Sequence, residues 1–257
     1  MSQIILNIVD GVAEVRLDNP SKLNALTVEM LTGLEAACDT IEGDRRVRSV
    51  LLTATGERAF CVGADISAWG TLSPADFARL WVRRGHRVFD RIARLAVPTI
   101  AVISGPAFGG GLELAAACDL RVISPESRLG LPETGIGIVP GWSGTQRLAR
   151  MIPPAILKEM VLLGRHLDAE RAFHLGLVNA ISNVPITEAH AMAAEIASKA
   201  AHATEVAKYQ VNAALGEDRD AMIEALGGAV MAGSDDKSEG VSAFMNKRKP
   251  NFGGSIS

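Results

Sequence analysis

The stretch from Thr99 to Glu113 reads TIAVISGPAFGGGLE, and it joins three patterns that together decide the fold. Residues 99–103 form a short apolar run rich in β-branched residues, which predicts a buried strand. Glycines follow at 105 and 109–111, where they permit a tight turn. The next residues, LELAAACDL (112–120), predict a helix. A strand that enters a helix through a glycine turn is typical of an α/β protein.

An earlier part of the chain repeats this order of elements. The apolar run at 49–53 predicts a second buried strand, and Gly56 predicts a turn. Residues 59–66 are expected to continue in an extended conformation. The likeness between 49–70 and 99–118 indicates successive copies of one ββα unit, so we expect an α/β core built from such units.

The segments on either side fit the same class. Residues 4–9 and 12–17 are strand-like and are joined by Asp10-Gly11, a strong signal for a hairpin. Thr27 is expected to cap one helix, and Pro74 to begin a longer one. The inward side of that longer helix is expected to consist of Phe77, Leu80, Trp81, Val88, Phe89 and Ile92.

Beyond Thr145 almost every segment predicts a helix, with one short strand near 177–181. Strands are therefore expected mainly in the first part of the chain. We expect an α/β core over residues 1–195 and a helical C-terminal region over residues 196–257, with no low-complexity linker between them.

Composition limits the classes of function. The chain has 257 residues, a formal net charge of −3 and 4% aromatic residues, which disfavours a nucleic-acid-binding surface. Its longest apolar stretch, 95–120, is broken by prolines, glycines and Glu113, so no membrane-spanning segment is expected. The N-terminal residues do not resemble a signal peptide, and the three cysteines form no pattern, which suits a reducing compartment. We expect a soluble, cytoplasmic protein.

Several motifs that often carry chemistry do not fit. Residues 141–145, GWSGT, approach the GxSxG motif of serine hydrolases, but the fifth position is threonine and the motif follows a loop. The glycines at 105–111 lack the Lys-Ser/Thr of a phosphate loop and the spacing of a dinucleotide site. The histidines have no spacing typical of metal ligands, so no metal site is predicted.

Two segments remain as candidates for a site: FCVGADI (60–66) and GPAFGGGLE (105–113). Small residues in each allow backbone N–H groups to face a ligand, and the second segment begins a helix, whose N-terminus favours negative charge. Two such N–H groups aimed at one point would form an oxyanion hole. The alternative is that these glycines serve only the tight turns between strands and helices.

Two acidic residues belong to this candidate site. Glu113 lies in the first turn of the predicted helix, where an acidic residue is also common for purely structural reasons. Glu133 lies in the loop GLPETGIG (130–137), where burial among apolar neighbours would raise its pKa; the alternative is an exposed loop acid. Two carboxyl groups beside an oxyanion hole suit proton transfer next to a carbonyl group.

The order of these motifs resembles that of the enoyl-CoA hydratase/isomerase (crotonase) family over nearly the whole chain. The two glycine-bearing motifs, in this order and spacing, are specific to the family and less specific to one activity within it. The resemblance rests on NP (19–20), LNAL (23–26), AFCVGADI (59–66), AV (101–102), Gly105, GGGLEL (109–114), CD (118–119), LPE (131–133), PG (140–141), GTQRL (144–148), EG (239–240), AF (243–244) and KR (247–248).

The resemblance implies a crotonase-like spiral of ββα units, followed by a helical C-terminal region that mediates trimerisation. It also implies a homotrimer or a homohexamer. By position, the backbone N–H groups of Ala64 and Gly110 match the oxyanion hole for the thioester oxygen of an acyl-CoA. Glu113 and Glu133 match the two catalytic glutamates of the hydratases in this family.

Further residues are expected, from the same resemblance, to contact the substrate. Ala64, Asp65, Ile66 and Ser67 match part of the loop that binds CoA, and Gly141 matches the residue whose backbone helps to hold the water.

Three more positions complete the expected substrate site. Lys22 matches a position that lines the CoA site. Lys247 is expected to reach the ligand of a neighbouring subunit; the alternative is a solvated basic end of the last helix. Trp142 stands where many hydratases have a small residue, which would shorten or redirect the acyl chain.

Together these features predict the reversible hydration of a trans-2-enoyl-CoA to a 3-hydroxyacyl-CoA. Two alternatives remain: an enoyl-CoA isomerase or dehydratase of the same family, and a catalytically inactive protein that binds acyl-CoA or serves in assembly. The predicted chemistry requires no cofactor apart from coenzyme A as part of the substrate, and no nucleic-acid or membrane partner is expected.

Overall fold

The computed structural model describes residues 2–253. The chain divides into two compact units between Lys208 and Tyr209. The boundary expected from the sequence, between residues 195 and 196, falls inside helix α8 (Pro185–Ala197), which packs against the sheet of the first unit. The last four residues of the predicted C-terminal region, 254–257, lie outside the described residues.

Strands and helices are interspersed up to residue 181, and the elements after it are helical. The strands are β1 (Gln3–Val9), β2 (Val12–Asp18), β3 (Ser49–Ala54), β4 (Thr99–Ile103), β5 (Ala107–Phe108), β6 (Leu120–Ile123), β7 (Arg128–Gly130), β8 (Leu167–Asp168) and β9 (Ala180–Ile181). The α-helices are α1 (Val28–Gly43), α2 (Pro74–Asp76), α3 (Arg83–Ala93), α4 (Gly110–Ala116), α5 (Gly144–Met151), α6 (Pro154–Leu163), α7 (Ala169–His174), α8 (Pro185–Ala197), α9 (Ala201–Ala214), α10 (Arg219–Ala232) and α11 (Asp235–Met245). Shorter turns are η1 (Pro20–Lys22), η2 (Ile66–Ala68) and η4 (Glu133–Ile136), and η3 (Phe77–Val82) is a π-helix.

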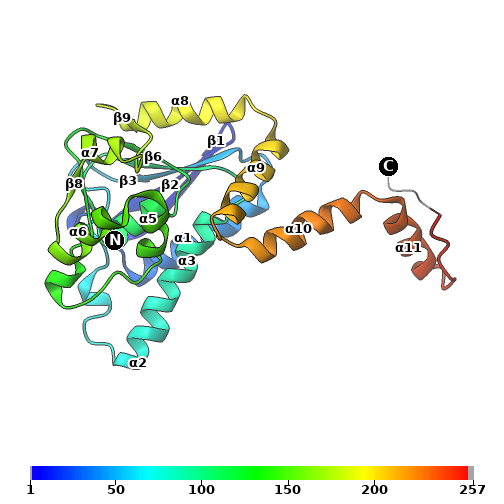
Figure 1. The fold of residues 1–257 in the computed structure, drawn as a ribbon, viewed down its shortest axis with the longest axis horizontal. Coiled ribbons are helices and arrows are strands. Elements are labelled where there is room, and N and C mark those ends of the chain that lie inside the picture. The colour runs from blue at the N-terminus through cyan, green and yellow to red at the C-terminus, as the bar shows by residue number, and fades with distance from the viewer. Residues whose placement is uncertain (1, 254–257) are drawn as a thin grey trace. The chain divides into compact units, whose positions relative to one another are not determined.

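Two sheets organise the first unit (Figure 1). The larger sheet has the strand order β1-β2-β3-β4-β6-β9, and the smaller one has the order β5-β7-β8. In the larger sheet β1 and β2 are antiparallel, as the predicted hairpin requires, and all other neighbours are parallel. Parallel neighbours joined through helices confirm the α/β class predicted from the sequence.

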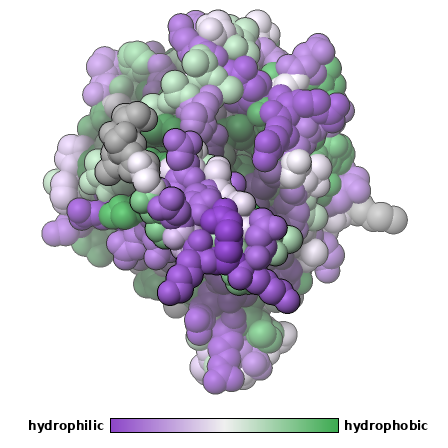
Figure 2. Space-filling view, turned by 90° about the vertical axis from the view of Figure 1, so that its right-hand side faces the viewer, coloured by the Kyte–Doolittle hydropathy of each residue, from purple (hydrophilic) through white to green (hydrophobic). Residues whose placement is uncertain are grey.

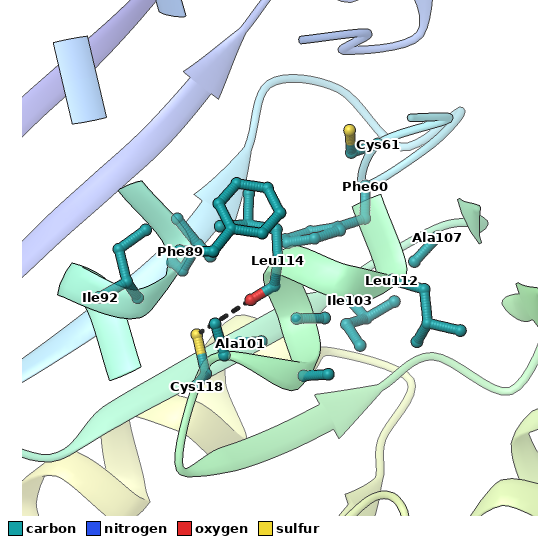
Figure 3. Packing of buried hydrophobic residues seen from close by; sticks show 14 of the residues in the cluster. Phe60, Cys61, Phe89, Ile92, Ala101, Ile103, Ala107, Leu112, Leu114 and Cys118 are labelled. Carbon is teal, nitrogen blue, oxygen red and sulfur yellow. Dashed lines mark hydrogen bonds between the residues drawn. The ribbon is translucent and has the colours of Figure 1, made fainter. Parts of the chain in front are cut away.

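Both faces of the central strands are buried, because successive side chains point to opposite faces. On one face Leu51, Ile100 and Val122 pack against Ala189 and Ala193 of α8. On the other face the same strands contribute to a larger core with α1 and α3. Figure 3 shows this core from close by, with apolar side chains of β4, α3 and α4 filling the space between the layers. The sheet therefore holds α4, and with it the glycine turn at 109–111, in a fixed position.

The helix expected from Pro74 begins there, with the hydroxyl of Ser73 accepting a hydrogen bond from Asp76 N. Its middle is the π-helix η3, whose wider turn changes the direction in which the following side chains point. Trp81 is buried as expected, but Leu80 is 60% exposed, so the prediction that Leu80 faces inward is wrong. The sequence pattern assumed an uninterrupted α-helical period, which the π turn breaks.

The segment 59–66, expected to be extended, makes single bridges instead of a regular strand. Cys61 pairs with Ala107, and Ala64 pairs with Leu26. These bridges hold the loop that carries Ala64 directly beside the strand β5 that leads into α4. The two segments singled out in the sequence are thereby brought together.

Arg121 ties the C-terminal end of α4 to the sheet. Its buried guanidinium donates hydrogen bonds to the carbonyl oxygens of Ala115, Cys118 and Leu177. Replacing Arg121 by methionine removes these three hydrogen bonds and should lower the free energy of unfolding by about 3 kcal/mol. Urea denaturation measures this loss, with Arg128→Met as the control because Arg128 is exposed. Equal losses in both variants would show that these hydrogen bonds do not stabilise the fold.

The second unit contains α10 and α11, and many of its large apolar side chains are exposed. Val230, Phe244 and Met245 are 73%, 83% and 73% exposed. Within residues 2–253 no helix is both long and apolar enough to cross a bilayer. The face of the molecule in Figure 2 is largely hydrophilic, with hydrophobic residues between the polar ones.

Candidate active site

A cavity of about 140 Å³ brings the predicted site residues of the first unit together. Ala64, Gly110, Glu113, Glu133 and Gly141 all line it. They come from four segments that are distant in sequence: the loop before η2, the start of α4, η4 and the loop before α5. The fold therefore places two small-residue segments and two carboxyl groups around one space.

The backbone N–H groups of Ala64 and Gly110 lie close to each other. The position that a Cβ atom would take on Gly110 is 3.7 Å from Ala64 N, and that on Gly63 is 3.5 Å from Gly110 N. Among the described residues neither N–H group donates a hydrogen bond to another protein atom. Gly110 is also the first residue of α4, whose N-terminal N–H groups have no partner within the helix. Two unused donors beside one cavity can form an oxyanion hole.

The backbone conformation of Gly109 allows the N–H groups of Gly110 and Ala64 to lie this close together. Gly109 has a φ of 51° and a ψ of −126°, a conformation open almost only to glycine. A Cβ atom on Gly109 would also lie 2.9 Å from Oε1 of Glu133. The carboxyl group of Glu133 therefore lies directly against the glycine turn that precedes α4.

The carboxyl group of Glu113 is almost fully buried and is held by backbone donors. Its Oε1 atom accepts hydrogen bonds from Trp142 N and Gly144 N, each at 2.9 Å. Burial raises the pKa of Glu113, and the N–H groups of Trp142, Gly144 and Gly141 and the charge of Arg147 oppose that rise. Burial is the larger effect, so the net shift in the pKa of Glu113 is upward, and the opposing groups lie where they would stabilise a negative charge on this carboxyl group.

Glu133 has a different environment. Burial, with a further contribution from the charge of Glu113, raises the pKa of Glu133 to about 7. Its Oε2 atom is buried and has no hydrogen-bond partner among the described residues. A carboxyl group with this pKa is partly protonated near neutral pH and can donate a proton. The two glutamates thus differ in hydrogen bonding: backbone N–H groups hold Glu113, whereas Oε2 of Glu133 has no partner among the described residues.

The remaining predicted substrate residues fall into three groups. Ile66 and Trp142 line the cavity. Lys22, Asp65 and Ser67 lie outside its lining, and Asp65 Oδ2 is 2.6 Å from the ammonium group of Lys22. Lys247 follows α11 in the second unit.

Sequence reasoning missed the aromatic lining of the cavity. Trp69, Phe77 and Trp81 lie there with Trp142, although the pattern had assigned Phe77 and Trp81 only to a helix core. The π-helix η3 carries two of them. The available signal was composition: the chain has three tryptophans, and all three line this cavity.

The GWSGT motif has a structural part in the site. Ser143 is buried, has a φ of 70°, and lies between the two residues whose N–H groups hold Glu113. Its hydroxyl lies 2.6 Å from Nδ1 of His86 and 3.3 Å from Asp90 Oδ1, and Asp90 in turn forms an ion pair with Arg147. Ser143 does not line the cavity. These contacts fix the turn that positions Trp142 N and Gly144 N.

Within residues 2–253 no cluster of three histidine, cysteine or acidic side chains could hold a metal ion. The chemistry that the cavity offers is that of its two carboxyl groups and two free N–H groups. Such a set can stabilise negative charge on a carbonyl oxygen while protons move at the neighbouring carbon atoms.

Comparison with known proteins gives the family. A model of the family "Enoyl-CoA hydratase/isomerase" matches residues 7–255. The chain is 35% identical over 253 residues to a crotonyl-CoA hydratase of Syntrophomonas wolfei and 34% identical over 255 residues to a short-chain-enoyl-CoA hydratase of Clostridium acetobutylicum, with 97% of each chain covered in both cases. Among solved structures, an enoyl-CoA hydratase of Bacillus anthracis is 32% identical and has a TM-score of 0.81, over 98% of this chain and 100% of that one. The protein described here therefore belongs to the enoyl-CoA hydratase/isomerase family.

Proposed function

We propose that the protein hydrates a trans-2-enoyl-CoA to a 3-hydroxyacyl-CoA, reversibly. One observation carries the proposal: two unused N–H groups and two carboxyl groups, both with a pKa raised by burial, line the same cavity. The two relatives named as hydratases support it.

Each N–H group and each carboxyl group of the site has one role in the proposed reaction. The thioester oxygen accepts hydrogen bonds from Ala64 N–H and Gly110 N–H, which polarises the conjugated double bond. A water molecule held between Glu113 and Glu133, with Gly141 alongside, adds its oxygen to C3 and gives its proton to Glu113. The electron pair of the double bond moves onto the thioester as an enolate, and C2 then takes a proton from Glu133. Water is added across the bond, with no electrons gained or lost, and Glu113 then releases its proton to solvent while Glu133 takes one up, which restores both carboxyl groups.

Carboxyl groups and backbone donors are sufficient for these steps, so we propose that no cofactor is needed apart from the coenzyme A of the substrate. Lys22, Asp65 and Ser67 are proposed to bind the CoA portion, because they form a polar cluster next to Ala64 and Ile66. Lys247 is proposed to contribute to a CoA site from the second unit.

Isomerisation on the same site would use the same carboxyl groups to move a proton between C2 and C4. The deciding assay follows crotonyl-CoA hydration and 3-enoyl-CoA isomerisation side by side with one enzyme preparation. Hydration is expected to be faster than isomerisation by at least tenfold. Faster isomerisation would replace the proposed function, and tight binding of acyl-CoA without turnover would make the protein a binding protein.

The pH dependence of hydration is a second prediction. Glu133 must be protonated to act as the acid, and it loses its proton above its pKa of about 7. The value of kcat/KM should therefore fall about tenfold per pH unit above pH 7. A rate that stays constant from pH 6 to pH 9 would remove Glu133 from the role of acid.

The exposed apolar residues of the second unit support a homotrimer or homohexamer. Val230, Phe244 and Met245 expose large apolar surfaces, and such surfaces often mark an interface with another protein chain. We propose that they pack against other copies of the chain, and sedimentation equilibrium measures the number of copies. The three cysteines are unpaired and buried, which suits the proposed cytoplasmic location.

A further inference from the structure

Trp142 is held in one place by its neighbours. Its side chain is buried, and its ring centroid lies 5.1 Å from those of both Trp81 and Phe89. Its backbone N–H holds the carboxyl group of Glu113. The indole ring therefore has a fixed position relative to the group that activates the water.

Gly85 of α3 provides the space for one edge of this ring. A Cβ atom at residue 85 would lie 2.2 Å from both Cε2 and Nε1 of Trp142, far closer than atoms can approach. Any residue larger than glycine at this position must displace the indole ring. Gly85 and Trp142 are thus complementary, although they are distant in the sequence.

The opposite edge of the ring faces the oxyanion donors. A Cβ atom on Gly110 would lie 2.9 Å from Cζ3 and 3.0 Å from Cε3 of Trp142. The indole ring therefore fills the space between α3 and the start of α4. The indole ring forms a wall of the cavity. A small residue at position 142 would leave the cavity open at this point.

The volume of the cavity favours a small acyl group. Its 140 Å³ is close to the volume of an engineered apolar cavity of about 150 Å³ that binds benzene. With the thioester and the double bond beside the two glutamates, a space of this size favours an acyl group with few further carbon atoms.

We propose that Trp142, seated against Gly85, closes the acyl end of the cavity and makes the enzyme selective for enoyl groups of about four to six carbons. This inference rests on the proposed function and adds its substrate class. The wall is fixed from both sides, so selectivity follows from the two residues together.

The test measures kcat/KM for straight-chain trans-2-enoyl-CoAs of four, six, eight and ten carbons. In Trp142→Ala the ratio of kcat/KM for the ten-carbon substrate to that for the four-carbon substrate should rise at least tenfold. One methylene group in an apolar pocket changes kcat/KM by about 10–200-fold. Trp142→Phe, which keeps an aromatic ring against Phe89, should give a smaller rise in the same direction. If Trp142→Ala does not fold, Trp142→Phe still decides the question.

Gly85→Ala should change the ratio in the opposite direction, because the added methyl group pushes the indole ring toward the cavity. Gly43→Ala is the matched control, since a Cβ atom on Gly43 meets no atom within 4 Å. Equal changes at all four chain lengths in the Trp142 and Gly85 variants would overturn the inference, as would an unaltered enzyme that accepts ten carbons as well as four. If the unaltered enzyme hydrates none of these substrates, the proposed function itself fails.

Discussion

Replacing Glu133 by glutamine is expected to reduce hydration of crotonyl-CoA by about 10²–10⁴-fold in kcat, which is the contribution of a well-placed acid. Glutamine has nearly the same shape as glutamate but cannot donate a proton from an acidic group. Because the oxyanion donors of Ala64 and Gly110 are unchanged, the dissociation constant of a product acyl-CoA should change less than threefold. Stopped assays of turnover and isothermal titration calorimetry measure the two quantities.

The control for this variant is Glu126→Gln, because Glu126 is exposed and does not line the cavity. It should retain full activity. Turnover of Glu133→Gln near that of the unaltered enzyme would exclude Glu133 from the mechanism. Equal losses of binding and turnover would show that the residue shapes the cavity and does not transfer a proton.

Glu133→Gln should also show how the raised pKa of Glu133 changes the free energy of unfolding. The pKa of Glu133 rises from 4.5 to about 7 on folding, so the folded state binds more protons than the unfolded state between these values. Stability from this group is therefore present at low pH and is lost as the pH rises toward 7. Because glutamine does not ionise, Glu133→Gln does not lose stability as the pH rises. It should be more stable than the unaltered enzyme at pH 8, although it is inactive.

Replacing Gly110 by proline should reduce kcat by about 10²–10³-fold, the loss measured when one oxyanion donor is removed from an enzyme. Proline has no backbone N–H, so it removes one of the two donors. Gly110 is the first residue of α4, a position at which helices tolerate proline. The measurement is turnover of crotonyl-CoA under saturating substrate.

The matched control is Gly110→Ala, which keeps the N–H group but adds the same Cβ atom beside Trp142. Ala64→Pro is a further variant, because residue 64 already carries a Cβ atom and its N–H donates no bond within residues 2–253. Both proline variants should lose more activity than Gly110→Ala. If Gly110→Ala loses as much as Gly110→Pro, the effect is steric and the N–H group is not a donor to the substrate.

The parts of the site that sequence could predict are those encoded locally. A glycine turn followed by a helix places Gly110 at the helix start and Glu113 in its first turn, and both lie there. The family resemblance then connected Ala64 and Glu133 with them. The sequence thus predicts that the two glutamates and the two amides belong to one site, and the structure places all four residues around one cavity.

The parts that sequence could not predict depend on packing between distant segments. The complementarity of Gly85 and Trp142 joins α3 to the loop before α5, and nothing in either segment alone indicates the other. The bonds from Trp142 N and Gly144 N to Glu113 arise in the same way. Hydrophobic periodicity also could not reveal the π turn that exposes Leu80 and brings Phe77 and Trp81 to the cavity.

A crystal structure of the protein with 3-hydroxybutyryl-CoA bound would show directly whether the two N–H groups and the two carboxyl groups act on one substrate. We expect the thioester oxygen to lie within about 2.7–3.1 Å of both Ala64 N and Gly110 N. We also expect the 3-hydroxyl group to lie between the carboxyl groups of Glu113 and Glu133. A thioester oxygen that contacts neither N–H group, or a hydroxyl group remote from both carboxyl groups, would contradict the account.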